Sequence, residues 1–173
     1  EDQMAALDQD KELSCVGTYA WTFKDNPLDI DGVITTPLTS DNIKKALLRG
    51  SPLIHGSLVI NRQALLKVGG YNGIYRYSAD LDMYDRFLHY YKAICLPKSL
   101  IGVRRHLNQG SRTIEAFNEN IEIFTIRLSE GEYSKQDETI LKASLAFHYL
   151  IRSQRYITLN KFGPALKDLF FSI

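Results

Sequence analysis

The chain has 173 residues, of which 45% are hydrophobic and 24% are charged. This is the composition of a globular protein large enough for one domain, or for one and a part. A net charge of +1, without a dense basic run, gives no argument for nucleic-acid binding. No apolar run approaches the roughly 18 to 20 residues that a membrane-spanning helix needs, and no signal peptide is recognisable.

The first segments predict a helix followed by a hairpin. Residues 1–7 have a helical pattern of apolar and polar side chains. Residues 14–23 alternate with a period of two and are rich in aromatic side chains, which predicts a strand. A turn signal then leads into residues 28–36, which we expect to form the returning arm.

The next segments predict a helix and a buried strand. Residues 40–50 have a helical pattern with Ser40 as the expected N-cap and a glycine at the end. Residues 52–60 are largely apolar and rich in branched side chains, which predicts a buried strand. His55 interrupts this run, either as a hydrogen-bonded structural residue or as a polar group beside a binding pocket.

The two cysteines, Cys15 and Cys95, both lie in apolar, strand-like runs and lack C-x-x-C spacing. Buried thiols in a reduced, intracellular protein are the favoured interpretation. The sequence leaves a disulfide between them open.

Residues 65–72 and 78–87 are the most informative stretch of the chain. The first predicts a short helix ended by Gly69 and Gly70, because glycine adopts positive φ without steric cost. The second predicts a new helix with Asp80 and Asp82 in its first turn, where acids are favoured by the helix dipole. These acids have two interpretations: helix capping with an Asp82 ion pair one turn on, or a catalytic carboxylate at a site.

Residues 93–96 and 100–107 predict two short strands separated by a proline. Arg104 and His106 are two positions apart in the second of them, so they project from the same face. A cation beside an imidazole suits a pyrophosphate group or its metal, and the alternative is a polar edge strand.

From residue 110 onward the pattern is entirely helical. A stripe over 114–128 is ended by Gly131, and Ser134 begins a capping box for the next helix. The inward face expected for that helix consists of Ile140, Ala143, Phe147 and Leu150. A last short helix begins at residue 163 and ends in a Phe-rich segment that we expect to pack inward, with a membrane surface or a partner as the alternative.

The ordered motifs between Ser51 and His106 resemble the back half of the catalytic domain of the inverting glycosyltransferase family 2, which has the GT-A fold. The resemblance rests on the set and its order, and one departure is Ala79 where the family usually has glutamate. The matching segments are Ser51-Pro52-Leu53-Ile54-His55, Arg62, Val68-Gly69-Gly70-Tyr71-Asn72, Ala79-Asp80-Leu81-Asp82, Tyr84, Arg86, Leu96-Pro97-Lys98-Ser99-Leu100 and Arg104-Arg105-His106.

The resemblance implies an α/β fold: an incomplete GT-A-like mixed sheet with flanking helices over 1–108, then a helical extension over 109–173. It implies Asp80 as the general base that deprotonates the acceptor hydroxyl, with Asp82 as a supporting acid. It also implies that His106 contacts a metal or the diphosphate, with Arg104 beside it. The residues that would shape the acceptor pocket are His55, Gly69, Gly70 and Tyr71.

The function implied is sugar transfer with inversion from a nucleotide-sugar donor to a glycan or lipid-linked acceptor, in polysaccharide or cell-surface glycan synthesis. The full-length enzyme would use Mg²⁺ or Mn²⁺. Because the donor-binding half and its D-x-D motif would precede Glu1, we expect this chain to be a fragment that is inactive alone. The expected location is the cytoplasm, or the inner face of the membrane. The alternatives are a non-catalytic helical interaction module and, less favoured, a metal-dependent hydrolase.

Overall fold

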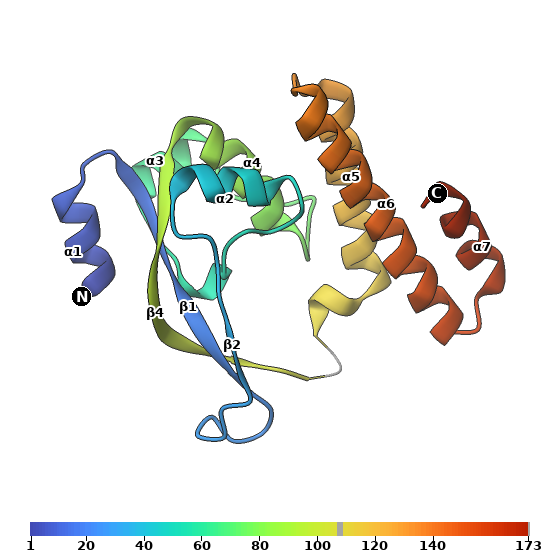
Figure 1. Cartoon of the computed structure of the whole chain (residues 1–173), viewed down its shortest axis with the longest axis horizontal. Helices are drawn as coiled ribbons and strands as arrows, with labels where there is room; N and C mark the ends of the chain where they lie inside the picture. Colours follow the sequence, from blue (N-terminus) through green and yellow to red (C-terminus); the bar gives the residue numbers. More distant parts are fainter. Residues whose placement is uncertain (107–108, 173) are drawn as a thin grey trace. The chain divides into compact units, whose positions relative to one another are not determined.

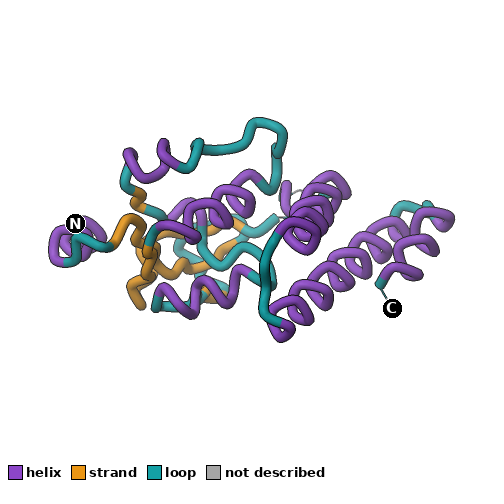
Figure 2. The backbone as a smooth tube through the Cα atoms, turned by 90° about the horizontal axis from the view of Figure 1, so that it is seen from above, coloured by secondary structure: helices purple, strands orange, loops and turns teal. Residues whose placement is uncertain are grey.

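The computed structural model describes residues 1–106 and 109–172 (Figure 1). The chain forms two compact units, Glu1–Asn72 with Asp80–Leu107, and Gly73–Ala79 with Asn108–Ile173. The first is a mixed α/β unit and the second consists of helices, so the predicted fold class is confirmed. Figure 2 shows that the described strands, in orange, all lie in the N-terminal part of the chain. The predicted domain boundary at residue 108 stays a prediction.

The sheet is built around the long strand β1 (Leu13–Phe23). Strand β4 (Lys92–Arg104) runs parallel to it along its whole length, from Leu13 opposite Lys92 to Phe23 opposite Arg104. Strands β2 (Gly32–Ile34) and β3 (Val59–Ile60) pair antiparallel with β1, β2 near its end and β3 near its start. Because a strand has only two edges, β2 and β3 share the edge of β1 that β4 leaves free.

Strand β1 forms the centre of the core. Val16, Thr18, Ala20 and Thr22 are all 0% exposed, and because they are two positions apart they form one fully buried face of the strand. Gly17 is required beside them, because a Cβ there would lie 2.8 Å from the Cys95 Sγ atom. Such a distance is far below van der Waals contact, so any side chain at position 17 would force the side chains of Cys95 and Leu58 to shift.

The cysteine thiols are buried and free. Cys15 is 2% exposed and Cys95 is 4% exposed, so the favoured interpretation of buried thiols is confirmed. Burial raises the pKa of Cys15 to about 12. The thiolate, which is the reactive form, is therefore suppressed at neutral pH.

Three strand predictions need correction. The predicted strand over 52–60 is instead a loop with the 3₁₀ turn η1 (His55–Ser57) followed by the two residues of β3. Ser57 explains why this segment is not a strand. Its hydroxyl bonds both the N–H and the C=O of Thr18, so a side chain and not a strand backbone makes the contact with β1 at this point. The predicted arm over 28–36 pairs only over β2.

The third correction concerns β4, which is one strand where two were predicted. Thr18 of β1 faces Leu96, whereas Tyr19 faces Ser99. Pro97 and the residue after it are therefore the extra residues of a bulge. A bulge tolerates a proline that cannot donate to the ladder, so the strand continues past it.

Four helices complete the α/β unit: α1 (Asp2–Gln9), α2 (Ser40–Leu47), α3 (Arg62–Lys67) and α4 (Ala79–Tyr90). The N-cap of α2 is Thr39, whose hydroxyl accepts the N–H of Asn42, so the prediction of Ser40 as the cap was wrong by one residue. The apolar side chains of α4 are buried over most of its length, with Tyr84 1% and Leu88 2% exposed.

The second unit contains η2 (Gly110–Arg112), α5 (Ile114–Glu130), α6 (Lys135–Thr158) and α7 (Phe162–Phe171). Gly131 ends α5 and Ser134 caps α6, as predicted. No described helix is both long enough and apolar enough to cross a membrane.

The inward face of α6 was predicted one residue too early. The buried residues of α6 are Leu141, Ser144, His148 and Ser153, whereas Phe147 is 57% exposed. Ser144 and His148 can be buried without leaving a polar group unsatisfied, because each bonds the main-chain carbonyl four residues earlier. Polar side chains satisfied in this way do not mark the outer face of a helix, which is why the apolar pattern was misleading.

Candidate functional site

The turn between α3 and α4 begins with the two glycines that the sequence predicts. Gly69 has φ +86° and Gly70 has φ +65°, both in the left-handed region that favours glycine. The N–H of Gly70 bonds the carbonyl of Leu65, which closes the end of α3. The chain then leads through Tyr71 towards α4.

Arg86 on α4 stabilises this turn by hydrogen bonds. Its guanidinium donates to the main-chain carbonyls of Val68 and Gly70, the latter at 2.8 Å. It also pairs with Asp82 one helical turn earlier, with Nε 3.2 Å from the carboxylate. The i,i+4 pair predicted for Asp82 is therefore present, and its visible role is to orient Arg86 towards the turn.

His55 lies between two tyrosines. Its Nδ1 is 2.9 Å from the hydroxyl of Tyr84, and its Nε2 is 3.3 Å from the hydroxyl of Tyr71. The rings of His55 and Tyr71 meet edge to face with centroids 5.5 Å apart. Tyr84 is 1% exposed, whereas Tyr71 is 47% exposed, so the chain of hydrogen bonds runs from the core of the unit to its surface.

Asp80 joins this group from the first turn of α4. One carboxylate oxygen accepts the N–H of Leu81 at 2.8 Å, and the other accepts the hydroxyl of Ser51 at 3.5 Å. Burial, and after it the negative charge of Asp80, raises the pKa of both Tyr71 and Tyr84. We call these five residues, Asp80, Ser51, His55, Tyr71 and Tyr84, the Asp80 cluster.

The Asp80 cluster borders a cavity. Ser51 lines a cavity of about 310 Å³, together with residues of the segments 34–37 and 46–54. The cluster thus combines a half-buried carboxylate, an imidazole and a partly exposed phenol, and its Ser51 hydroxyl connects Asp80 to a residue that lines this cavity. Such an arrangement can accept a proton at Asp80 and position a hydroxyl-rich ligand by hydrogen bonds.

Arg104 and His106 do not join the Asp80 cluster. Arg104 lies at the far end of β4, where its Nε donates to the carbonyl of Lys24 at 3.0 Å. Arg104 pairs with Phe23 on β1, whereas Ser57 bonds Thr18 of the same strand. Five residues separate Thr18 from Phe23, which corresponds to roughly 17 Å along the strand. His106 is exposed just beyond β4, and among the described residues no hydrogen bond or ion pair links it to Asp80. The donor-side roles expected of these two residues stay predictions.

The described residues do not form a metal site. No group of three His, Cys, Asp or Glu side chains among them could hold a metal ion. Asp82 faces Arg86, and Asp80 accepts hydrogen bonds from a main-chain N–H and a hydroxyl. These two carboxylates are thus engaged with protein donors and do not form a site for a divalent cation.

Sequence reasoning missed two members of the cluster and the role of one glutamate in the helical unit. Tyr84 and Ser51 were named only as parts of the family 2 motifs, without a role in the site. A buried phenol needs a hydrogen-bond partner. The isolated His55 in an apolar run was the feature of the sequence that could have indicated a partner for Tyr84. Glu119 of α5 was also missed. Its carboxylate accepts the N–H groups of residues 76–78, the segment immediately before α4, at 2.8 to 2.9 Å.

Comparison with known proteins gives limited similarity. No family model matches the chain, and no curated protein matches it. Among solved structures, the chain is similar to a mannosyltransferase from Pyrobaculum calidifontis in complex with GDP-Man and Mn2+, with 17% identity and a TM-score of 0.43. The match covers 93% of this chain and 42% of that protein, so the chain spans less than half of its length.

Proposed function

We propose that the chain is the acceptor-side part of a glycosyltransferase, which transfers a sugar from a nucleotide-sugar donor to an acceptor hydroxyl with inversion. The observation that carries the proposal is the carboxylate of Asp80, which is half-buried at the N-terminus of α4 and accepts a hydrogen bond from Ser51, a residue that lines a cavity. The order of family 2 motifs around it agrees with this assignment. We further propose that turnover needs the complete protein and not this chain alone.

In this mechanism Asp80 is the general base. Inverting transfer is a single displacement at the anomeric carbon, and the attacking hydroxyl must lose its proton as the new bond forms. The Leu81 N–H and the Ser51 hydroxyl fix the direction of the carboxylate, which leaves the proton acceptor pre-positioned. The proton passes from the acceptor oxygen to a carboxylate oxygen of Asp80.

Tyr71 and His55 serve to position the acceptor. The raised pKa keeps the Tyr71 phenol protonated at neutral pH, so its hydroxyl can both donate and accept. Nearly half of this side chain is exposed, whereas Tyr84 holds the imidazole from the buried side. Gly69 and Gly70 let the main chain approach the acceptor closely, because they carry no side chain.

The test is a comparison of Asp80→Asn with Asp41→Asn in the complete native protein that contains this chain. Asp41 is an exposed acid in the first turn of α2, which makes it a matched first-turn acid away from the cluster. Loss of a general base predicts a fall in kcat of about 10²- to 10⁴-fold for Asp80→Asn and no change for Asp41→Asn. Transfer is measured as nucleoside diphosphate release with a panel of donors and glycan acceptors.

The same experiment separates catalysis from helix capping. Asparagine caps helices about as well as aspartate, so a capping role predicts almost unchanged stability and activity for Asp80→Asn. Full transfer activity in Asp80→Asn would overturn the assignment of the base. A product with retained anomeric configuration would overturn the inverting mechanism.

A further inference from the structure

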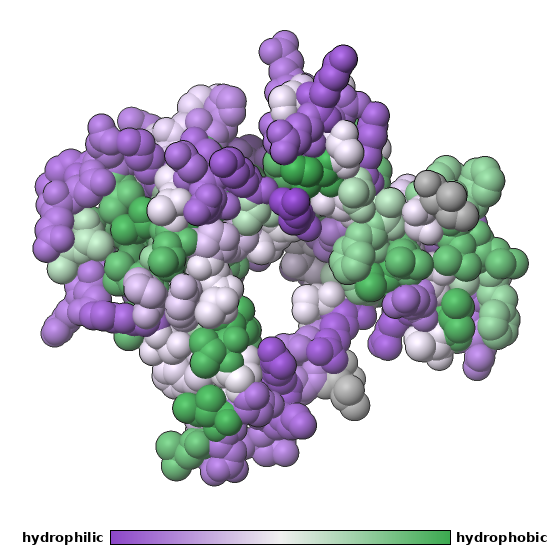
Figure 3. Space-filling view, in the orientation of Figure 1, coloured by the Kyte–Doolittle hydropathy of each residue, from purple (hydrophilic) through white to green (hydrophobic). Residues whose placement is uncertain are grey.

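Helix α7 carries hydrophobic side chains on the side that faces away from α6. Phe162, Leu166 and Phe170 recur every four residues and are 60%, 68% and 78% exposed. The opposite side of the helix is buried, with Ala165 2% and Asp168 3% exposed. Side chains four apart lie on one helix face, so these three form a continuous strip, which we call the α7 strip. Hydrophobic residues gather over α7 in the space-filling view, at the right-hand edge (Figure 3).

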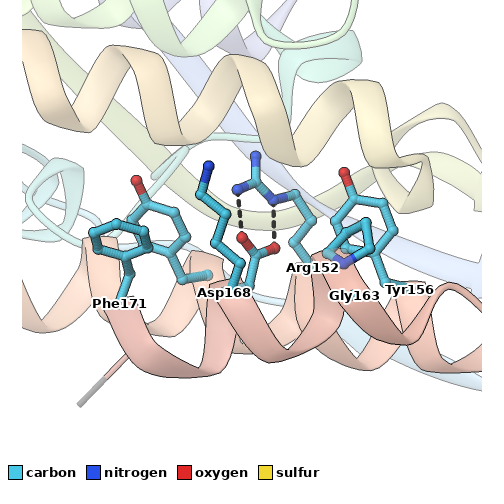
Figure 4. Close-up of a pocket in the computed structure, with 8 residues that line it drawn as sticks. Arg152, Tyr156, Gly163, Asp168 and Phe171 are labelled. Atoms are coloured by element: carbon cyan, nitrogen blue, oxygen red, sulfur yellow. Dashed lines mark hydrogen bonds and ion pairs between the residues drawn. The ribbon is translucent and has the colours of Figure 1, made fainter.

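The outward direction of the α7 strip is fixed by the contacts of the inner face. Asp168 accepts two hydrogen bonds from Arg152 of α6, both at 2.7 Å, and Figure 4 shows this pair between the two helices. The Ser153 hydroxyl bonds the carbonyl of Ala165 at 3.0 Å, and Phe171 stacks on Tyr149 with centroids 5.4 Å apart. Rotating α7 to hide the strip would break a buried ion pair, which is strongly unfavourable.

The segment that ends in the α7 strip has more basic than acidic residues. Residues 151–172 contain Arg152, Arg155, Lys161 and Lys167 against a single acid, Asp168. Asp168 is neutralised by Arg152, which leaves Arg155, Lys161 and Lys167 as exposed cations of this segment. Lys167 also lines a cavity of about 560 Å³ between α6 and α7.

We propose that the α7 strip docks on the surface of a bilayer that contains anionic phospholipid. Phe162, Leu166 and Phe170 would enter the boundary between headgroups and acyl chains, with the helix lying in the plane of the surface. Lys161 and Lys167 would extend their alkyl stems past the strip to lipid phosphates. The surplus of basic residues selects this occupant, because a second copy of the chain would bring the same positive charge towards it. The inference does not depend on the proposed sugar transfer.

The test measures co-sedimentation of the full chain with vesicles of phosphatidylcholine alone, and of an equimolar mixture of phosphatidylcholine and phosphatidylglycerol. We expect binding to the anionic vesicles only, weakened by added salt. Phe162→Ser/Phe170→Ser should lower the partition coefficient by about tenfold or more, because two exposed aromatic side chains no longer leave water. Lys161→Gln/Lys167→Gln should lower it by about tenfold.

The matched control is Leu28→Ser/Ile30→Ser. These two side chains are 85% and 60% exposed and lie between β1 and β2, in the other unit. The control removes a similar exposed apolar surface, and binding should be unchanged. Lys44→Gln/Lys45→Gln on α2 is the corresponding control for charge.

A tryptophan probe provides a second measurement that does not require loss of binding. Leu166→Trp places an indole in the strip, where a blue shift of its emission on addition of anionic vesicles would report burial in lipid. The proposal is overturned if the chain ignores anionic vesicles, or if the two serine substitutions in the strip leave binding intact. It is also overturned if the strip instead mediates self-association, seen as a concentration-dependent dimer that Phe162→Ser/Phe170→Ser abolishes without any lipid binding.

Discussion

Arg86 and Asp82 lie one turn apart on α4, and the guanidinium that pairs with this carboxylate also holds the glycine turn through the carbonyls of Val68 and Gly70. One side chain thereby connects a helix, its first-turn acid and the loop that leads to Tyr71. The relationship makes Asp82 a positioning residue in the structure, while Asp80 is the acid that reaches the polar cluster.

Arg86→Lys should destabilise the α/β unit although it retains the charge. An ammonium cannot reproduce the planar fork that serves a carboxylate and two carbonyls together. We expect a loss of about 1 to 3 kcal/mol in the free energy of unfolding, because partly buried carbonyls lose their donors. Urea denaturation measures it, and Arg62→Lys, at an exposed position on α3, is the control. A stability equal to that of Arg62→Lys would contradict the role given to Arg86.

Gly70→Ala should cost about 1 to 2 kcal/mol through backbone strain alone. Its φ of +65° is unfavourable for an L-residue with a side chain, whereas nothing lies within 4 Å of the added Cβ. Gly73→Ala is the control, since that position has neither a positive φ nor a close neighbour. Thermal unfolding should show a lower Tm for Gly70→Ala and no loss for Gly73→Ala. Equal values in both variants would mean that the turn relaxes freely.

Gly17→Ala should be destabilising for a different reason, namely overpacking. The added Cβ would lie 2.8 Å from the Cys95 Sγ atom and 2.9 Å from a methyl carbon of Leu58. Such overlaps in a packed core typically cost about 1 to 3 kcal/mol. Adding Cys95→Ala to Gly17→Ala removes the sulfur from the closest overlap and should restore part of the stability. No recovery in the double variant would show that the clash with β4 is not the cause.

The stability of the helical unit should fall when the pH drops below the ordinary pKa of histidine. Burial lowers the pKa of His148, an effect that the nearby Arg127 charge reinforces and the Ser144 carbonyl opposes. Because the folded-state pKa lies below that of the unfolded chain, the unfolded chain takes up the proton first. The stability from neutral His148 is therefore fully present above about pH 6.5 and is lost as the pH falls towards the folded-state pKa.

The measurement is denaturant unfolding between about pH 7.5 and 5.5, above the range in which most carboxylates titrate. His148→Gln should flatten the pH dependence, whereas His89→Gln, at an exposed position on α4, should leave it in place. An identical slope in wild type and His148→Gln would refute the assignment.

Features fixed by nearby residues were predictable from the sequence. The two glycines after α3, the Ser134 cap and the first-turn acids of α4 all depend on interactions within a few positions along the chain. The same holds for the Asp82–Arg86 pair. Local backbone chemistry decides such features almost regardless of what packs against them.

Features fixed by distant residues were not predictable. The segment 52–60 is apolar enough for a strand, but Ser57 bonds Thr18, which is 39 positions away, and turns it into a loop. The link between His55 and Tyr84 likewise joins residues 29 positions apart. The sequence could therefore identify His55 as unusual without revealing its partner, and it could identify Asp80 without revealing Ser51.

The parallel pairing of β1 with β4 has a consequence for synthesis of the chain on the ribosome. The paired residues, from Leu13 with Lys92 to Phe23 with Arg104, are roughly 80 positions apart in the sequence. The most buried strand of the molecule therefore leaves the exit tunnel long before its principal neighbour has been translated. Until Arg104 emerges, the nascent segment 13–23 presents an open hydrophobic edge, the kind of edge that invites mispairing and that chaperones recognise.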